Sequence, residues 1–193
     1  MKSPIKIALT GRLASGKDIA VNYIVTMFDF QPYRFSAKGK SFFYELFPEL
    51  KDESKPRQPM RDFIDGITTL PVPGAESVWV DYTFRQIDDH IKRQCCRQAK
   101  VLITDVRKPI EYDRVRKEGF TIIRITAPEA IRIERAKKRG DQFDLADLDH
   151  PTELAVNHFE VDYEIENAGK PEELYEKLDA IMAELLTENH TAL

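Results

Sequence analysis

The sequence predicts an α/β fold in which a parallel β-sheet of mostly five strands lies between two layers of helices. Short apolar runs of strand length alternate with longer segments of helical periodicity, and this alternation is typical of a parallel sheet covered on both faces. A chain of 193 residues, 42% of them apolar and 32% charged, has the size and composition of one globular domain. We therefore expect a single three-layer domain over residues 1–193.

Each expected strand is a run of four to six residues, rich in apolar side chains and bounded by glycine, proline or charged residues. The five runs are 5–9, 33–36, 101–104, 121–126 and 162–166. The third is the clearest, because four uncharged residues directly precede Asp105. The carboxyl ends of these strands are where a parallel sheet gathers its functional residues.

Each expected helix carries apolar side chains three and four residues apart. The segments are 17–28, 37–47, 61–67, 78–98, 109–118, 128–140, 151–158 and 171–186. Ser36 is the expected N-cap of the second helix, and Gly119 and Gly140 mark the ends of two others. The proline-containing segment 51–59 and the aspartate-rich segment 141–150 lack this spacing and are expected to be loops.

Residues 11–17, Gly-Arg-Leu-Ala-Ser-Gly-Lys, fit the Walker A pattern G-x-x-x-x-G-K between the first strand and the first helix. In that context the N–H groups of the loop surround a phosphate, the helix N-terminus adds positive potential, and Lys17 bridges the β- and γ-phosphates of a nucleotide. The residues expected to bind ATP here are Gly11, Arg12, Ala14, Ser15, Gly16, Lys17 and Asp18.

Two carboxylates are candidates for Mg²⁺. Asp18 stands where most such loops carry the Ser or Thr whose hydroxyl binds the metal. A carboxylate there can still reach the ion or its water shell; the alternative is a loop that has lost metal binding. Asp105, at the end of an inner strand, is the second candidate. We expect ATP and Mg²⁺ as cofactors.

Charge is distributed unevenly along the chain. The formal net charge is −4, yet Arg107–Gly140 carries eleven basic and five acidic residues, whereas residues 141–193 carry two and fifteen. A nucleic-acid binder usually has an extended basic surface and a basic total, so no polymeric nucleic acid is expected as a partner. A local basic segment in an acidic chain suits a small, highly charged anion.

Three arginines of the basic segment share one helix face. Arg132, Arg135 and Arg139 are spaced i, i+3 and i+7, which suits a lid that closes over phosphates. The alternative is a solvated basic face that pairs with Glu129 and Glu134.

Arg107 follows Asp105 by two residues, and its guanidinium could bind an anionic substrate, the phosphoryl acceptor, through two parallel hydrogen bonds. The alternative is a structural salt bridge between Arg107 and Glu111. Arg34, Arg57 and Arg61 are further candidates to bind the acceptor, against the alternative of plain surface charges.

Other features argue against membrane and metal-cluster classes. The apolar runs fall far short of the roughly 20 residues that a membrane span needs, and the first residues lack a signal-peptide pattern, so a cytoplasmic protein is expected. The adjacent Cys95 and Cys96 are expected to be free thiols. The four histidines show no metal spacing.

Four segments in this order resemble P-loop kinases of small phosphorylated metabolites. They are the Gly-Lys-Asp end of the loop, Thr104-Asp105-Val106-Arg107 with Glu111-Tyr112, the arginine-rich stretch Arg132–Arg139, and the D-x-x-I-x-N-x-G pattern of Asp162, Ile165, Asn167 and Gly169. This group includes deoxynucleoside monophosphate kinases, animal-type phosphomevalonate kinases and dephospho-CoA kinases. The resemblance implies a P-loop NTPase fold with a core of residues 1–36, 99–131 and 159–193, a helical acceptor lobe at about 37–98 and a lid at about 132–150.

The resemblance also implies a reaction. It is the ATP-dependent transfer of a phosphoryl group to a phosphate of a nucleoside or deoxynucleoside monophosphate, by a monomer or homodimer. The implied catalytic residues are Lys17, Asp105, Arg132 and Arg135; Arg132 and Asn167 are added to the ATP site, and Arg34, Arg57, Arg61 and Arg107 form the acceptor site. Alternatives are a kinase of another phosphorylated metabolite, such as dephospho-CoA or phosphomevalonate, and a non-kinase ATP-binding regulator.

Overall fold

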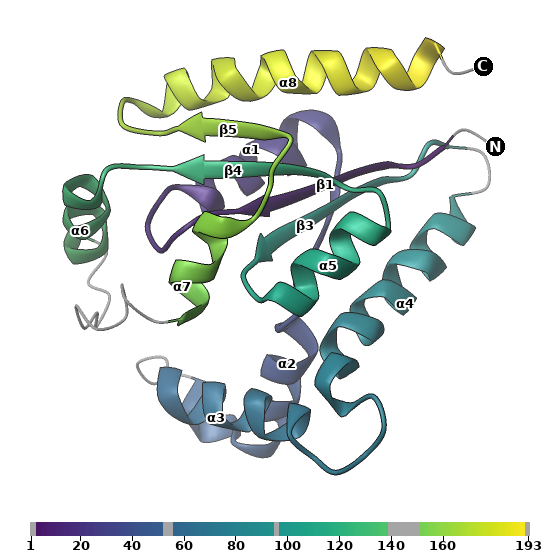
Figure 1. Ribbon diagram of the computed structural model, residues 1–193, viewed down its shortest axis with the longest axis vertical. Helices are drawn as coiled ribbons and strands as arrows, with labels where there is room; N and C mark the ends of the chain where they lie inside the picture. The colour runs from purple at the N-terminus through teal and green to yellow at the C-terminus, as the bar shows by residue number, and fades with distance from the viewer. Residues whose placement is uncertain (1–2, 52–55, 95–96, 139–150, 192–193) are drawn as a thin grey trace.

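The computed structural model describes residues 3–51, 56–94, 97–138 and 151–191 (Figure 1). Within these ranges a five-stranded sheet has the order β2-β3-β1-β4-β5, and every neighbouring pair is parallel. The strands are β1 (Ile5–Thr10), β2 (Gln31–Tyr33), β3 (Lys100–Val106), β4 (Thr121–Thr126) and β5 (Tyr163–Glu166). The expected α/β fold with a parallel sheet is confirmed.

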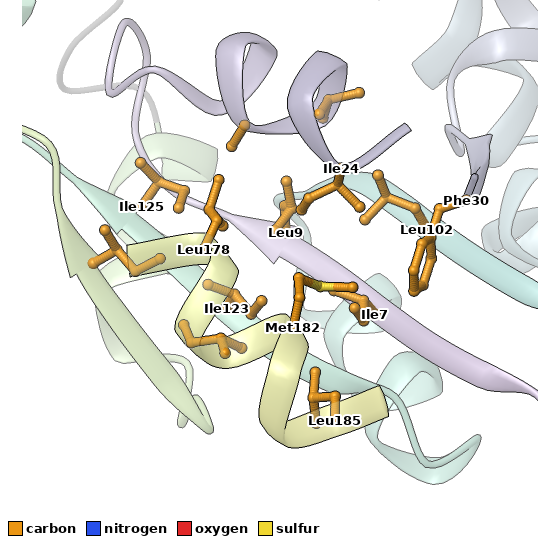
Figure 2. Close-up of a cluster of buried hydrophobic side chains, with 14 of the residues drawn as sticks. Ile7, Leu9, Ile24, Phe30, Leu102, Ile123, Ile125, Leu178, Met182 and Leu185 are labelled. Atoms are coloured by element: carbon orange, nitrogen blue, oxygen red, sulfur yellow. The ribbon is translucent and has the colours of Figure 1, made fainter. Parts of the chain in front are cut away.

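One face of the sheet packs against α1 (Lys17–Phe28) and α8 (Pro171–Thr191). Figure 2 shows Ile7 and Leu9 of β1 beside Ile24 of α1 and Met182 of α8, all of them fully buried. Residues of β1 that alternate with these, such as Ala8, face the opposite layer. Burial on both faces explains why the strands are nearly continuous apolar runs.

The other face packs against α4 (Val78–Arg93) and α5 (Pro109–Lys117). Phe84 and Ile87 of α4 and Val115 of α5 join the strand residues Val101 and Ile103 in this second core. The remaining helices of the carboxyl half are α6 (Glu129–Lys138) and α7 (Pro151–Ala155), which is followed by the 3-10 turn η4 (Val156–His158). The helices therefore cover both faces, as the alternating pattern predicts.

The helices that lie between β2 and β3 in the sequence form a group that extends away from the sheet (Figure 1). It comprises α2 (Ala37–Leu46), η1 (Pro48–Lys51), α3 (Arg57–Thr68), η2 (Ala75–Ser77) and the start of α4. Gly39 of α2 allows close packing here, because a Cβ at this position would lie 2.9 Å from Cγ1 of Ile64. The indole nitrogen of Trp79 donates to the carbonyl of Ile64 at 3.0 Å, so Trp79 is a buried packing residue.

Several expected boundaries are wrong. The second strand is Gln31–Tyr33 instead of 33–36, and Ser36 stands at the N-cap of α2 without a side-chain cap bond. The segment predicted as the loop 51–59 already contains the start of α3 at Arg57. Pro59 is tolerated because first-turn N–H groups have no partner within a helix. Helix α4 ends at Arg93, five residues before the predicted 98.

Some expectations lie outside the described residues. They concern Arg139, Gly140, the segment 141–150, the pair Cys95 and Cys96, and the side chain of Arg57. Over the ranges that are described, no helix is long and apolar enough to cross a membrane.

Candidate active site

A cleft of about 1220 Å³ opens at the carboxyl ends of β1 and β3. Its walls come from residues 11–17, called the phosphate loop below, the end of β3, helices α2 and α3, and the last turn of α6. Eight basic and four acidic side chains line it: Lys17, Arg34, Lys40, Arg61, Arg107, Lys108, Arg135 and Lys138, with Asp18, Asp65, Asp105 and Glu111. Residues from distant parts of the sequence therefore form one basic cleft.

The phosphate loop has the backbone that its glycines permit. Gly16 has φ +104°, a conformation that side-chain-bearing residues rarely adopt, and Gly11 also has a positive φ. A Cβ on Gly16 would collide with the amide nitrogen of Asn167. That amide nitrogen donates to the carbonyl of Ser15 at 2.8 Å, and Asn167 is buried. The side chain of Asn167 thus stabilises the conformation of the loop at Ser15 and Gly16.

Lys17 is buried at the start of α1 with its ammonium folded onto the loop. Its Nζ donates to the carbonyl oxygens of Gly11 and Arg12 and lies 3.7 Å from Oδ1 of Asp105. Burial lowers the pKa of Lys17 below its ordinary value, because the attraction of Asp105 only partly offsets the loss of water. Lys17 is therefore a poorly hydrated basic group in the phosphate loop, and a nearby anion such as Asp105 favours its charged form.

Asp105 stands at the end of β3 between two cations. Its Oδ2 accepts from Nε of Arg107 at 2.7 Å. Burial acts to raise the pKa of Asp105, but Arg107 and Lys17 outweigh it and hold the pKa below its ordinary value. The carboxyl group is thus an anion whose Oδ1 is buried and has no hydrogen-bond partner among the described residues.

The residues present fit a Mg²⁺ ion that is bound mainly through nucleotide phosphates and water. Such sites need only one or two protein carboxylates. Asp105 offers Oδ1, which accepts no hydrogen bond from the described residues, and Asp18, largely exposed, lines the same cleft. The described residues hold no cluster of three or more His, Cys, Asp or Glu that would bind a metal by themselves.

Arg107 is surrounded by carboxylates. Its Nε bonds Asp105, its Nη1 bonds Glu153, and its backbone N–H donates to Glu111 at 2.8 Å. Burial acts to lower the pKa of Arg107, but Asp105 and Glu153 outweigh this and raise it. The alternative of a side-chain salt bridge between Arg107 and Glu111 is not what the structure shows. Glu111 instead accepts backbone N–H groups at the start of α5, and burial raises its pKa.

The side of the cleft formed by residues 34–35, α2 and α3 combines basic groups with an apolar wall. Phe35, Tyr44, Met60 and Ile64 supply the wall. Arg34 donates from Nε to the hydroxyl of Thr104 at 2.9 Å, and its Nη2 lies 3.5 Å from Asp18. Arg61 lines the cleft from α3. Of the expected acceptor residues, the structure thus brings Arg34, Arg61 and Arg107 to one cleft.

The two described arginines of the expected lid lie differently. Arg135 lines the cleft, and its Nη1 donates to the carbonyl of Asn167 at 3.0 Å. Arg132 is buried beneath the loop, with Nη1 3.4 Å from the carbonyl of Leu13 and Nη2 3.5 Å from Glu129. Burial, and to a lesser extent Arg12, lower the pKa of Arg132.

Several charged residues of the site carried no sequence signal. Lys40 and Lys108 line the cleft but belong to no motif, and Lys138 lines it from the Arg132–Arg139 stretch, where only the arginines were expected to act. Glu153 bonds both Arg107 and the backbone of Leu13 from a short helix that follows the aspartate-rich segment. Such a contact depends on tertiary structure and leaves no pattern in the sequence.

The phosphate loop after the central strand of a parallel five-stranded sheet, with the cleft at its carboxyl edge, defines a P-loop kinase-like fold. No protein-family model and no curated protein sequence matches the chain. Solved structures do. A gluconokinase from Sinorhizobium meliloti 1021 is 18% identical, with a TM-score of 0.57 over 98% of each chain.

Two further solved structures are similar. A sugar kinase from Janibacter sp. HTCC2649 has 15% identity and a TM-score of 0.58, with 92% of this chain and 93% of that chain covered. A shikimate kinase from Acinetobacter baumannii, in complex with shikimate, has 12% identity and a TM-score of 0.54 over 95% of each chain. At such low identity these likenesses establish the P-loop kinase fold, and the acceptor has to be argued from the site.

Proposed function

We propose that this protein is an ATP-dependent small-molecule kinase that transfers the γ-phosphoryl group of ATP to a phosphate of a nucleoside or deoxynucleoside monophosphate. The observation that carries the proposal is that the phosphate loop shares one cleft with Arg34, Arg61 and Arg107, which lie next to an apolar wall. Phosphoryl transfer between two anions requires positive charge on both sides of the migrating group and reactants held in line.

On the donor side, the loop amides and Lys17 bind the β- and γ-phosphates of ATP. To do so, the ammonium of Lys17 leaves the carbonyl groups of Gly11 and Arg12. Mg²⁺, when bound, neutralises phosphate charge, and Asp105 and Asp18 are the carboxylates that would hold it or its water ligands. Arg135 lines the same cleft from α6, and Arg132 supports the loop through its contact with the carbonyl of Leu13.

On the acceptor side, Arg34, Arg61 and Arg107 bind the phosphate that is to be extended. The apolar wall around Tyr44 and Met60 suits the flat, largely apolar face of a nucleobase. In this proposal residues 37–98 are the acceptor lobe, and residues 132–138 are the described part of a lid whose predicted extent is 132–150. The core comprises residues 1–36, 99–131 and 159–193.

The chemistry of Asp105 favours a phosphate acceptor over a hydroxyl acceptor. A hydroxyl nucleophile needs a general base whose pKa lies near the working pH. Asp105 lines the cleft at the end of β3, next to the phosphate loop, and Arg107 and Lys17 hold its pKa below the ordinary value, which makes it a weak base. A phosphate acceptor is already an anion near neutral pH and needs little base catalysis.

An acceptor panel tests the proposal. The protein is incubated with ATP and Mg²⁺ and, in turn, each nucleoside and deoxynucleoside monophosphate, dephospho-CoA, phosphomevalonate, gluconate and shikimate, and ADP formation is measured. We expect turnover with at least one nucleoside monophosphate. Turnover with only a non-nucleotide phosphate would support a kinase of another phosphorylated metabolite. Turnover with only a hydroxyl acceptor, or ATP binding without any acceptor-dependent ADP formation, would overturn the proposal.

A further inference from the structure

Glu153 is a buried carboxylate outside every recognised motif. It lies on the short helix α7 and is only 4% exposed. Its Oε2 accepts the backbone N–H of Leu13 in the phosphate loop, and its Oε1 accepts Nη1 of Arg107 after β3. Glu153 does not line the cleft, so its influence on a reaction there passes through the groups that it holds.

The first of these groups is the backbone of Leu13 in the phosphate loop. Glu153 accepts the N–H of Leu13, and the carbonyl oxygen of Leu13 faces Nη1 of Arg132 at 3.4 Å. Charged side chains from α6 and α7 thus fix both polar groups of one loop residue. A hydrogen bond with a charged partner is stronger than one between neutral groups, so this part of the loop has a defined orientation before a nucleotide binds.

The second group is the guanidinium of Arg107. Asp105 holds Nε and Glu153 holds Nη1, whereas Nη2 has no hydrogen-bond partner among the described residues. Two anchored nitrogen atoms fix the plane of a rigid guanidinium and remove most of its rotamer freedom. Arg107 lines the cleft, so a fixed cation with one unused nitrogen is presented beside the phosphate loop.

We propose that Glu153 is a positioning residue that ties Arg107 to the phosphate loop. The same carboxylate sets the loop that binds the donor phosphates and the arginine that binds the acceptor phosphate, and thereby sets the geometry between the two anions. For its chemistry this inference rests on the proposed function. Phosphoryl transfer depends strongly on such alignment, because a small displacement of one reactant lowers the rate.

Glu153→Gln tests the proposal kinetically. Glutamine keeps the size of the side chain but replaces one acceptor oxygen by a donor NH2 group, so it cannot accept from Leu13 and Arg107 through two separate oxygens as Glu153 does. Loss of one hydrogen bond to a charged group corresponds to roughly a 10- to 100-fold loss of binding. We expect the KM of the acceptor to rise by about this factor, with a smaller change in the KM of ATP.

The matched control is Glu164→Gln. Glu164 accepts from Nη1 of Arg124 at 2.8 Å, and neither residue lines the cleft. Melting temperatures show whether each variant folds. A second comparison combines Glu153→Gln with Arg107→Gln. If Glu153 acts through Arg107, the loss caused by Glu153→Gln shrinks to less than about 3-fold in the Arg107→Gln background. An equal loss in both backgrounds, a loss no larger than that of Glu164→Gln, or tighter ATP binding would overturn the proposal.

A spectroscopic measurement separates this inference from the proposed function. Rotation about the Cζ–Nη bonds of an arginine is hindered when carboxylates hold its nitrogens. We therefore expect separate Nη1 and Nη2 signals for Arg107 in ¹⁵N spectra, assigned by their loss in Arg107→Gln. The signals should merge in Glu153→Gln and persist in Glu164→Gln. Unchanged signals in Glu153→Gln would refute the positioning role even if the kinase activity is found, and merged signals would support it even if no acceptor is turned over.

Discussion

Gly16→Ala is a direct test of how the phosphate loop is held. Gly16 has φ +104°, and a Cβ on it would lie 2.0 Å from the amide nitrogen of Asn167, which would have to move. Gly74 offers a matched control, because it has φ +81° and no atom within 4 Å of an added Cβ. Both substitutions strain the backbone, but only Gly16→Ala displaces a neighbour.

The expected difference follows from these contacts. A left-handed backbone costs a non-glycine residue about 1–2 kcal/mol, which applies to both variants. Displacing Asn167 leaves the carbonyl of Ser15 without its 2.8 Å hydrogen bond. A buried polar group that loses its partner costs about 1–3 kcal/mol. Gly16→Ala should therefore lower the free energy of unfolding by about 2–5 kcal/mol, and Gly74→Ala by about 1–2 kcal/mol.

Thermal unfolding and ATP titration measure the two effects. For a chain of this size 1 kcal/mol corresponds to about 2–4 °C in melting temperature, so the two variants should differ by roughly 2–12 °C. Gly16→Ala should also weaken ATP binding, whereas Gly74→Ala should leave it unchanged. Equal melting temperatures, or full ATP affinity in Gly16→Ala, would show that Asn167 does not brace the loop.

Two further predictions concern the charges of the cleft. Lys17→Met keeps an unbranched side chain that is one atom shorter and removes its charge, so ATP affinity should fall at least about 10-fold, while the melting temperature stays within about 6 °C. Titration with ATP and thermal unfolding check both, and wild-type affinity would refute the loop assignment. The pKa of Asp105 lies below its ordinary value, so its ion pairs stabilise the fold above about pH 4, and this stabilisation is lost as the pH falls through the folded pKa. The difference in unfolding free energy between wild type and Asp105→Asn should therefore be largest near pH 7 and shrink below about pH 4, and a difference that does not vary with pH would contradict the ion pairs.

Local patterns in the sequence explain what could be predicted. The strand, glycine loop and helix of residues 5–28 are encoded by neighbouring residues, and the expected helix 17–28 matches α1 to the residue. The buried strands 101–104 and 121–126 were recognisable because a sheet covered on both faces needs continuous apolar runs. The weakly apolar second strand has only three residues, and its position was missed.

The site was predictable only in part, for a physical reason. The glycine motif and the ends of strands identify Lys17 and Asp105, since topology alone brings these positions together. The partners of Arg107 are different, because α7 supplies Glu153 through packing that no short-range pattern encodes. The resemblance adds Asn167 to the ATP site, and the structure shows its side chain donating to the carbonyl of Ser15, a contact that no local pattern encodes.

The phosphate loop is held by hydrogen bonds with residues that come much later in the sequence, and this has a consequence for synthesis. Glu153 follows Leu13 by 140 residues and Asn167 follows Ser15 by 152 residues, so both are synthesised long after the loop that they bond. Strand β1 likewise has no paired strand until β3 and β4 have been synthesised. A nascent or truncated chain that ends before about residue 167 therefore carries the complete glycine motif without the contacts that shape it. The loop therefore acquires the hydrogen bond that supports Ser15 only after the segment that follows β5 has been synthesised.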